Sequence, residues 1–331
     1  MAVSIKDIQK LREMTGAGLA DCKKALEESN GEIDPAIEII RKKGQAVAAK
    51  RSDREASEGC VLVKKDGNFA AIIALKCETD FVANNADFVK LTQDILDAAV
   101  AARCKTLDQV KALPLGEGTV QDAVVARSGI TGEKMELDGY SVIEGEDIAT
   151  YDHQSKHSLC TMVALSKQVQ DATVGKNVAM QVASANPVAV DQSNVAQDVI
   201  DSELRVAVEK TKEEQIAKAV EAAIRKAGVN PAHVDSEDHI ESNMAKGWIT
   251  PEQAAMVREI KEKVAAEKAA NLPEQMIQNI AQGRLKKFFK ENCLLEQEFI
   301  WDKNITVAQY LQSVDKELTV TDFKRFTLRA E

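Results

Sequence analysis

Two histidines and a cysteine that lie close together in the sequence, His153, His157 and Cys160, are the side chains best suited to hold a metal ion. Imidazole nitrogens and thiolates are common zinc ligands in proteins. These three residues, however, fall across the turn of an expected strand pair, where alternation directs side chains to opposite faces. We therefore expect no metal site here, and we place the remaining histidines, His233 and His239, at the surface.

The sequence contains none of the motifs that mark common catalytic sites. There is no Gly-x-x-x-x-Gly-Lys-Ser/Thr phosphate loop, no Gly-x-Ser-x-Gly nucleophile elbow and no His-Glu-x-x-His zinc motif. The run Gly16-Ala17-Gly18 lacks the preceding strand that a dinucleotide site requires, so a turn between helices is the better interpretation. We expect a protein that acts by binding rather than by covalent chemistry, and we expect no cofactor.

Basic and aromatic residues occur together where Lys286, Lys287 and Lys290 surround Phe288 and Phe289. Such a cluster can bind single-stranded nucleic acid through charge and stacking. The chain carries a formal net charge of -10, which disfavours phosphate backbones because nucleic-acid affinity rests largely on Lys and Arg. We therefore assign the two phenylalanines to a core and expect no direct nucleic-acid partner.

An acid and a bulky aromatic residue, Asp80 and Phe81, follow a nearly continuous apolar stretch and precede an expected helix. From the residue pattern alone, Asp80 is best interpreted as a helix cap and Phe81 as a core residue. The alternative, a functional loop, needs further support.

Three short helices are predicted at the start of the chain, in residues 1–45. Ser4 can cap the first helix, which should end near Thr15, and the second runs from about 19 to 28. Asp34 is expected to cap the third helix with Pro35 at its first position, and Gly44 is its expected end. A bundle this small usually serves to bind something. Residues 46–59 have no apolar stripe and predict a solvated helical linker.

An α+β core with two related halves is predicted for much of the remaining chain. Residues 61–63 and 69–75 flank Asp66-Gly67, which is typical of a β-hairpin with a two-residue turn, and a helix with apolar spacings of three and four follows over 87–102. The same order recurs downstream. We assign residues 60–140 to the first half, and residues 141–194 with 293–331 to the second, each with a small antiparallel sheet covered on one face by helices.

An almost wholly helical segment, residues 195–292, interrupts the second half. Its apolar stripe includes Leu204, Val208 and Ile216, and Pro251 and Pro273 mark the starts of later helices. An antiparallel helical hairpin is the simplest arrangement. A last helix is expected from Thr306 and a last strand at about 319–328.

The sequence favours a cytoplasmic location. Its six cysteines show no Cys-x-x-Cys pair, and we expect buried, reduced thiols. No signal-peptide core is recognisable, and no apolar run approaches the roughly 18 residues that a membrane span needs. We expect no membrane partner.

Three separated motifs, in order, resemble the elongation factor Ts family. They are LREMTGAGLADCKKAL at residues 11–26, KCETDFVA at residues 76–83 and GRLKKF at residues 283–288. The resemblance spreads over most of the chain. It implies a guanine nucleotide exchange factor that binds the GTPase elongation factor Tu, releases its GDP and so lets GTP bind.

The resemblance also implies roles for particular residues. The first three helices are similar to a ubiquitin-associated module that docks on the GTPase, and the implied contact residues are Met14, Thr15, Gly16, Ala17, Gly18 and Leu19. The loop of Thr79, Asp80, Phe81 and Val82 is implied to displace the Mg²⁺ ion of the GTPase. His153, in the context Tyr151-x-His153, is implied to be a further contact.

Two departures from the family pattern limit this transfer. The helical hairpin is longer than usual by about residues 220–268, and a C-terminal helical module found in some relatives is not expected here. A homodimer, or a complex of two chains with two elongation factor Tu molecules, is left open. The alternative functions are an adapter of the ubiquitin-associated type without exchange activity, and an enzyme of unrecognised chemistry.

Overall fold

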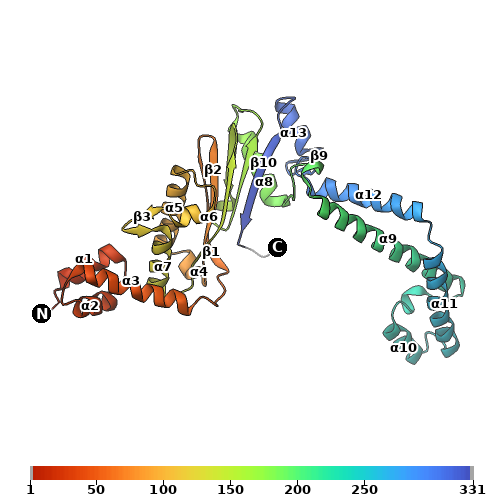
Figure 1. Cartoon of the computed structure of the whole chain (residues 1–331). Helices are drawn as coiled ribbons and strands as arrows, with labels where there is room; N and C mark the ends of the chain where they lie inside the picture. The colour runs from red at the N-terminus through yellow and green to blue at the C-terminus, as the bar shows by residue number, and fades with distance from the viewer. Residues whose placement is uncertain (1–2, 329–331) are drawn as a thin grey trace. The chain divides into compact units, whose positions relative to one another are not determined.

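The computed structural model describes residues 3–328 and divides the chain into two compact units. Unit 1 comprises residues 1–190 and 297–331, and unit 2 comprises residues 191–296. Helices and small antiparallel sheets alternate along the chain (Figure 1), so the fold is of the α+β class. Within the described residues, no helix is both long and apolar enough to cross a membrane.

Unit 1 begins with three helices, α1 (Ile5–Thr15), α2 (Leu19–Glu28) and α3 (Ile33–Lys50). Ser4 caps α1 as predicted, because its side chain accepts a hydrogen bond from the Asp7 amide, and Gly16 ends the helix in the left-handed conformation. Leu11, Cys22 and Leu26 are fully buried between the helices. These helices therefore share a small apolar core of their own.

The predicted bounds of the third helix are wrong at both ends. The helix begins at Ile33 with Glu32 at its N-cap, so Asp34 lies in the first turn and is not the cap. It also continues through Gly44, which is buried, to Lys50. Gly44 lies where α3 crosses α7 (Val120–Thr131), and the two helices pack together. Close approach of two backbones, rather than helix termination, explains this glycine.

The first sheet has the strand order β1-β2-β5 and is antiparallel throughout. Its strands are β1 (Glu58–Asp66), β2 (Phe69–Cys77) and β5 (Glu136–Glu144). The predicted hairpin is confirmed, but its register pairs Asp66 with Phe69, so the turn residues are Gly67 and Asn68. Gly67 has a φ of +58°, which a glycine adopts without strain. In the segment expected to be a helical linker, helix ends at residue 50 and strand begins at residue 58.

Helices cover the outer face of this sheet. The predicted helix after β2 is α5 (Ala86–Ala101), which packs on β1 and β2 and buries Phe88, Ile95 and Ala99. The other elements between β2 and β5 are α4 (Asp80–Ala83), α6 (Leu107–Lys111), α7, and the short strands β3 (Pro114–Leu115) and β4 (Gly118–Thr119).

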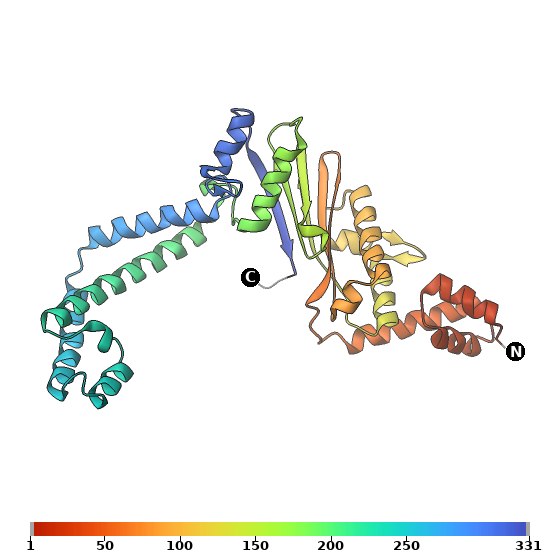
Figure 2. The ribbon, with the colours of Figure 1, turned by 180° about the vertical axis from the view of Figure 1, so that it is seen from behind.

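The second sheet repeats this arrangement with the strand order β10-β7-β6. Its strands are β6 (Asp147–Asp152), β7 (Leu159–Leu165) and β10 (Val320–Thr327), and α8 (Ala172–Ala185) lies against its outer face (Figure 2). Residues 297–319 add β8 (Glu298–Phe299), β9 (Asp302–Thr306) and α13 (Val307–Val314). This last helix was expected to start at Thr306, which is its N-cap. The return of the chain after residue 296 thus completes the sheet.

The inner faces of the two sheets pack against each other. Val61 and Ile72 of the first sheet meet Ile148, Met162 and Ala164 of the second in one apolar cluster. The opposite face of the first sheet belongs to a separate cluster with α5. Since both faces of β2 are covered, nearly every residue from Phe69 to Cys77 is buried, which accounts for its continuous apolar sequence.

Unit 2 consists of helices. They are α9 (Gln197–Lys226), α10 (Glu237–Ala245), α11 (Pro251–Ala270) and α12 (Glu274–Asn292), with the 3-10 turns η2 (Gln192–Asn194) and η3 (Pro231–His233). The long helix α9 packs against both α11 and α12. The segment expected to be a plain hairpin also contains an apolar core around α10, which includes Ile224, Val234, Ile240 and Val257.

Candidate functional site

The most exposed large apolar side chain in the described part of the chain is that of Phe81, at 84%. Phe81 lies in the one-turn helix α4, whose N-cap is Thr79: the Thr79 hydroxyl accepts a hydrogen bond from the Val82 amide at 3.4 Å. The interpretation from residue pattern alone is therefore wrong, since Asp80 is not the cap and Phe81 is not a core residue. Val82 and Ala83 instead contact the apolar core between the first sheet and α5.

The start of this turn is held by hydrogen bonds that involve two carboxylates, those of Glu133 and Glu78. One oxygen of Glu133 accepts hydrogen bonds from the amides of Glu78 and Thr79, each at 3.1 Å, and the other accepts from the Thr79 hydroxyl at 2.6 Å. The Glu78 carboxylate in turn accepts from the Lys134 amide at 2.6 Å and from Arg51, with Nη1 at 3.0 Å from each oxygen. An exposed phenyl ring thus projects from a turn whose base is fixed.

The electrostatics of this base favour an ionised Glu78 carboxylate. The hydrogen bond from the Lys134 amide, and then the guanidinium of Arg51, hold the pKa of Glu78 below its ordinary value. The Glu78 side chain is only 14% exposed, so water screens its interaction with Arg51 little.

A second structured turn, η1 (His153–Ser155), follows strand β6. The Tyr151 hydroxyl lies 3.0 Å from His153 Nδ1, and Asp152 binds the ring and the amide of His157 at 2.5 and 3.2 Å. Gln154, Ser155 and His157 all have φ values between 54° and 56°, a conformation that is unfavourable for residues with a Cβ atom. Local contacts therefore hold the backbone of this turn in an uncommon shape.

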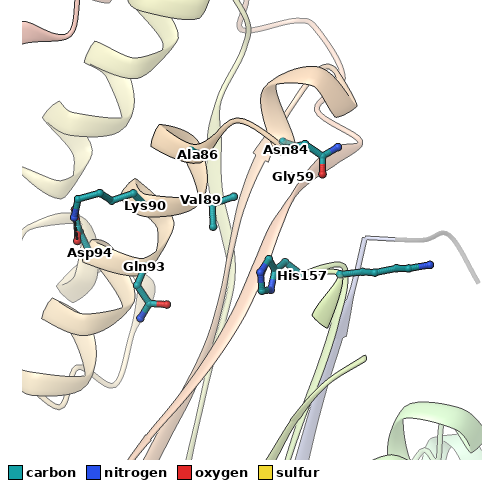
Figure 3. Close-up of a pocket in the computed structure, with 10 residues that line it drawn as sticks. Gly59, Asn84, Ala86, Val89, Lys90, Gln93, Asp94 and His157 are labelled. Atoms are coloured by element: carbon teal, nitrogen blue, oxygen red, sulfur yellow. Dashed lines mark hydrogen bonds and ion pairs between the residues drawn. The ribbon is translucent and has the colours of Figure 1, made fainter. Parts of the chain in front are cut away.

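The residues that directly follow the two turns line one hollow of about 570 Å³. Ala83 and Asn84 line it at the end of α4, Val89 and Gln93 from α5, and Lys156 with His157 just after η1. In Figure 3 the side chains of Val89 and Gln93 lie on one side of the opening and the His157 ring on the other. Tertiary structure therefore brings the segments that follow the Thr79–Val82 turn and η1 to one hollow, which we name the α5 hollow. Neither the Thr79–Val82 turn nor His153 is among its lining residues.

The histidines and the cysteine that could suggest zinc are used otherwise. The His153 and His157 rings have the partners described above, and the Cys160 thiol is buried between the sheets, 3.3 Å from the Val61 carbonyl oxygen. Among residues 3–328 no group of three or more His, Cys, Asp or Glu side chains is placed to hold a metal ion.

The residues implied at the N-terminal module differ in their accessibility. Met14 and Leu19 are 47% and 52% exposed, and Gly16 and Gly18 are exposed as well. Thr15 is half-buried and donates to the Leu11 carbonyl at 2.7 Å. Ala17, at 3% exposure, belongs to the core of the three helices and offers no side-chain surface. The side-chain surface that residues 14–19 offer to a partner is therefore smaller than these six residues would suggest.

The sequence pattern did not identify Arg51 and Glu133, the residues that fix the base of the Thr79–Val82 turn. Arg51 and Glu133 are ordinary charged residues, 27 and 55 positions from Glu78 in the sequence. No local periodicity or motif distinguishes them from other surface charges. Only the fold brings them to the base of α4.

The family model and the similar known proteins all point to the same family. A family model described as "Elongation factor TS" matches residues 78–330. The chain is 66% identical over 331 residues to "Elongation factor Ts" of Bacteroides thetaiotaomicron and 67% identical over 331 residues to that of Bacteroides fragilis. It is 44% identical over 332 residues to "Elongation factor Ts" of Porphyromonas gingivalis. Each alignment covers 100% of both chains.

Proposed function

Because this chain belongs to the elongation factor Ts family, it is a translation elongation factor, and we propose that its Thr79–Val82 turn is the part that acts on the GTPase elongation factor Tu. Elongation factors of this family promote nucleotide exchange: the factor binds elongation factor Tu with GDP, and GDP leaves so that GTP can bind. The observation that carries the proposal is the exposure of Phe81 on a turn with a fixed base.

The site that the factor would disturb is the Mg²⁺ and phosphate site of elongation factor Tu. Mg²⁺ bridges phosphate oxygens in nucleotide sites and neutralises their charge, so displacing its ligands weakens nucleotide binding. Phe81 is the group that would enter beside this site and move the partner's chain mechanically. Asp80, also exposed in the free protein, would hydrogen-bond the displaced segment.

Phe81 alone is too weak to expel the nucleotide. A nanomolar nucleotide is held by about 12 kcal/mol, whereas full burial of one phenylalanine contributes about 1.5–3 kcal/mol. Further contacts must stabilise the nucleotide-free partner. Because coupling is reciprocal, the free energy with which the factor weakens nucleotide binding equals that with which nucleotide weakens binding of the factor. Exchange then proceeds without any covalent step.

Two surfaces are suited to supply those contacts. The three N-terminal helices, in the role of a ubiquitin-associated-like docking module, present Met14 and Leu19 to a partner. The α5 hollow, beside the turn that contains His153, would receive a second segment of the GTPase next to the point where Phe81 enters. Simultaneous attachment at both places would hold Phe81 against the nucleotide site.

Stopped-flow release of fluorescent GDP from elongation factor Tu tests this proposal. Phe81→Ala should slow the release stimulated by saturating factor by about 10- to 100-fold, which corresponds to loss of the transfer free energy of one phenyl ring. Trp301→Ala, which removes another exposed aromatic residue of unit 1, is the matched control and should release GDP at the wild-type rate.

The same measurement separates the alternatives. Release at the wild-type rate by Phe81→Ala would refute the role of the turn. An adapter without exchange activity would bind elongation factor Tu, yet leave the rate of GDP release unchanged even in the wild-type protein.

A further inference from the structure

One continuous helix connects the N-terminal module to the base of the Phe81 turn. Helix α3 begins inside the three-helix core, crosses α7 at Gly44 and ends at Lys50, directly before Arg51. The crossing is close: a Cβ atom at Gly129 would lie 2.5 Å from the Gly44 Cα atom. Module and core are therefore joined by a packed helix pair rather than by a flexible linker.

A residue at the end of α3 and a residue just after α7 each bind the residues at the start of the turn. At the end of α3, Arg51 binds both carboxylate oxygens of Glu78, the residue that precedes Thr79. Just after the end of α7, Glu133 binds the amides of Glu78 and Thr79 and the Thr79 hydroxyl. The amide of Lys134 returns a hydrogen bond to Glu78, so the two carboxylates secure each other's backbone.

The segment that carries Glu133 is itself held. The Ser128 hydroxyl donates to the Glu133 carbonyl at 2.5 Å, and the Glu133 amide donates to the Thr131 hydroxyl at 3.3 Å. Gly132, in the left-handed conformation, ends α7, and Glu133 follows it directly. Position and direction of the Glu133 carboxylate are thus set by α7, the helix on which α3 packs.

We infer that Arg51, Glu78 and Glu133 form a clamp that fixes the Phe81 turn relative to the N-terminal module, so that Arg51 and Glu133 are positioning residues for nucleotide exchange. The inference rests on the proposed function of Phe81. A turn held before the encounter loses little conformational freedom when Phe81 enters the partner, and this ordering cost otherwise slows the committed step. Docking through Met14 and Leu19 does not depend on the clamp.

The clamp predicts a split between the two kinetic parameters of exchange. For Glu133→Ala, the maximal rate of GDP release at saturating factor should fall about tenfold, while the half-saturating concentration of factor should stay within about twofold of wild type. Glu133→Gln keeps an oxygen that can accept from the Glu78 and Thr79 amides, so it should recover most of the maximal rate. Glu146→Ala, at an exposed acid between β5 and β6, is the control and should match wild type.

A double variant shows whether Glu133 acts through Phe81. In the Phe81→Ala background, Glu133→Ala should slow release by less than about twofold further, because the group that the clamp positions is already absent. If Glu133→Ala reduces the folded fraction in thermal unfolding, Arg51→Ala takes its place, because this change removes only a partly exposed side chain at the end of α3.

The outcomes distinguish the two proposals. Wild-type release by Phe81→Ala would refute the role of Phe81, and with it any action of the clamp through that residue. Slow release by Phe81→Ala together with a wild-type maximal rate for folded Glu133→Ala or Arg51→Ala would overturn the clamp alone. Equal, additive losses from Glu133→Ala in both backgrounds would also overturn it.

Discussion

Gly44 of α3 and Gly129 of α7 form the contact through which the N-terminal module joins the core of unit 1. A Cβ atom at position 129 would lie 2.5 Å from the Gly44 Cα atom, and one at position 44 would lie 3.2 Å from the Val125 carbonyl oxygen. Only residues without a side chain allow the helices to approach this closely. The orientation of α3, and hence the position of Arg51, depends on this crossing.

Gly129→Ala should therefore force α3 and α7 apart. We expect a loss of about 1–3 kcal/mol in the free energy of unfolding, as in overpacked cores, although alanine itself favours helix. Urea unfolding measures the change. Gly283→Ala is the matched control, because Gly283 also lies in a helix but a Cβ atom added there would meet no atom within 4 Å, and it should be neutral or slightly stabilising. Equal effects at both glycines would contradict the close crossing.

Glu78 should make the stability of unit 1 depend on pH. The Lys134 amide and Arg51 lower the pKa of Glu78 in the folded protein below its ordinary value of 4.5. The stabilisation is then fully present above about pH 4.5 and is lost as the pH falls through the lowered pKa. At pH 7 the wild type should be more stable than Glu78→Gln by about 1.5–3 kcal/mol.

This difference should shrink when urea unfolding is repeated at decreasing pH below 4.5. Glu55→Gln, at an exposed acid between α3 and β1, serves as the control and should change stability by less than about 0.5 kcal/mol at pH 7. A difference between wild type and Glu78→Gln that stays constant across this pH range would exclude an ionised, clamped Glu78.

Gln181 should be important for holding the returning chain against α8. Its side chain is buried; Nε2 donates to Gln297 Oε1 and to the Glu298 carbonyl, each at 3.2 Å, and Oε1 accepts from the Ile300 amide at 2.8 Å. Gln181→Leu removes these bonds at nearly constant volume, and we expect a cost of about 1–3 kcal/mol in urea unfolding. The exposed Gln121→Leu should cost less than about 0.5 kcal/mol. Comparable values for the two variants would show that the buried network contributes nothing.

The core around α10 should stabilise unit 2 specifically. Ile240 is fully buried there, so Ile240→Ala should destabilise unit 2 by about 2–5 kcal/mol. The two tryptophans, Trp248 in unit 2 and Trp301 in unit 1, allow each unit to be followed separately by fluorescence in a Trp→Phe background. Ile240→Ala should lower the midpoint reported by Trp248 much more than that reported by Trp301. A common shift of both midpoints would mean that the units unfold together.

Local sequence was sufficient where a structure depends on neighbouring residues. The Ser4 cap, the start of the last helix near Thr306, the hairpin from Glu58 to Cys77 and the helix that buries Phe88 and Ile95 all follow from spacings within a few turns or strand repeats. Apolar runs also indicated buried, free cysteines, and all six are buried. Three ordered motifs were enough to indicate the family.

The sequence by itself thus determined most of the local elements, the α+β class and the family. Tertiary structure alone decided that Phe81 faces solvent, that Ala17 does not, and that Gly44 continues a helix instead of ending it. It also decided that Arg51 and Glu133 meet at Glu78. The physical reason is common to all four: burial, helix crossing and charge pairing depend on contacts between residues far apart in the chain, which local spacing does not encode.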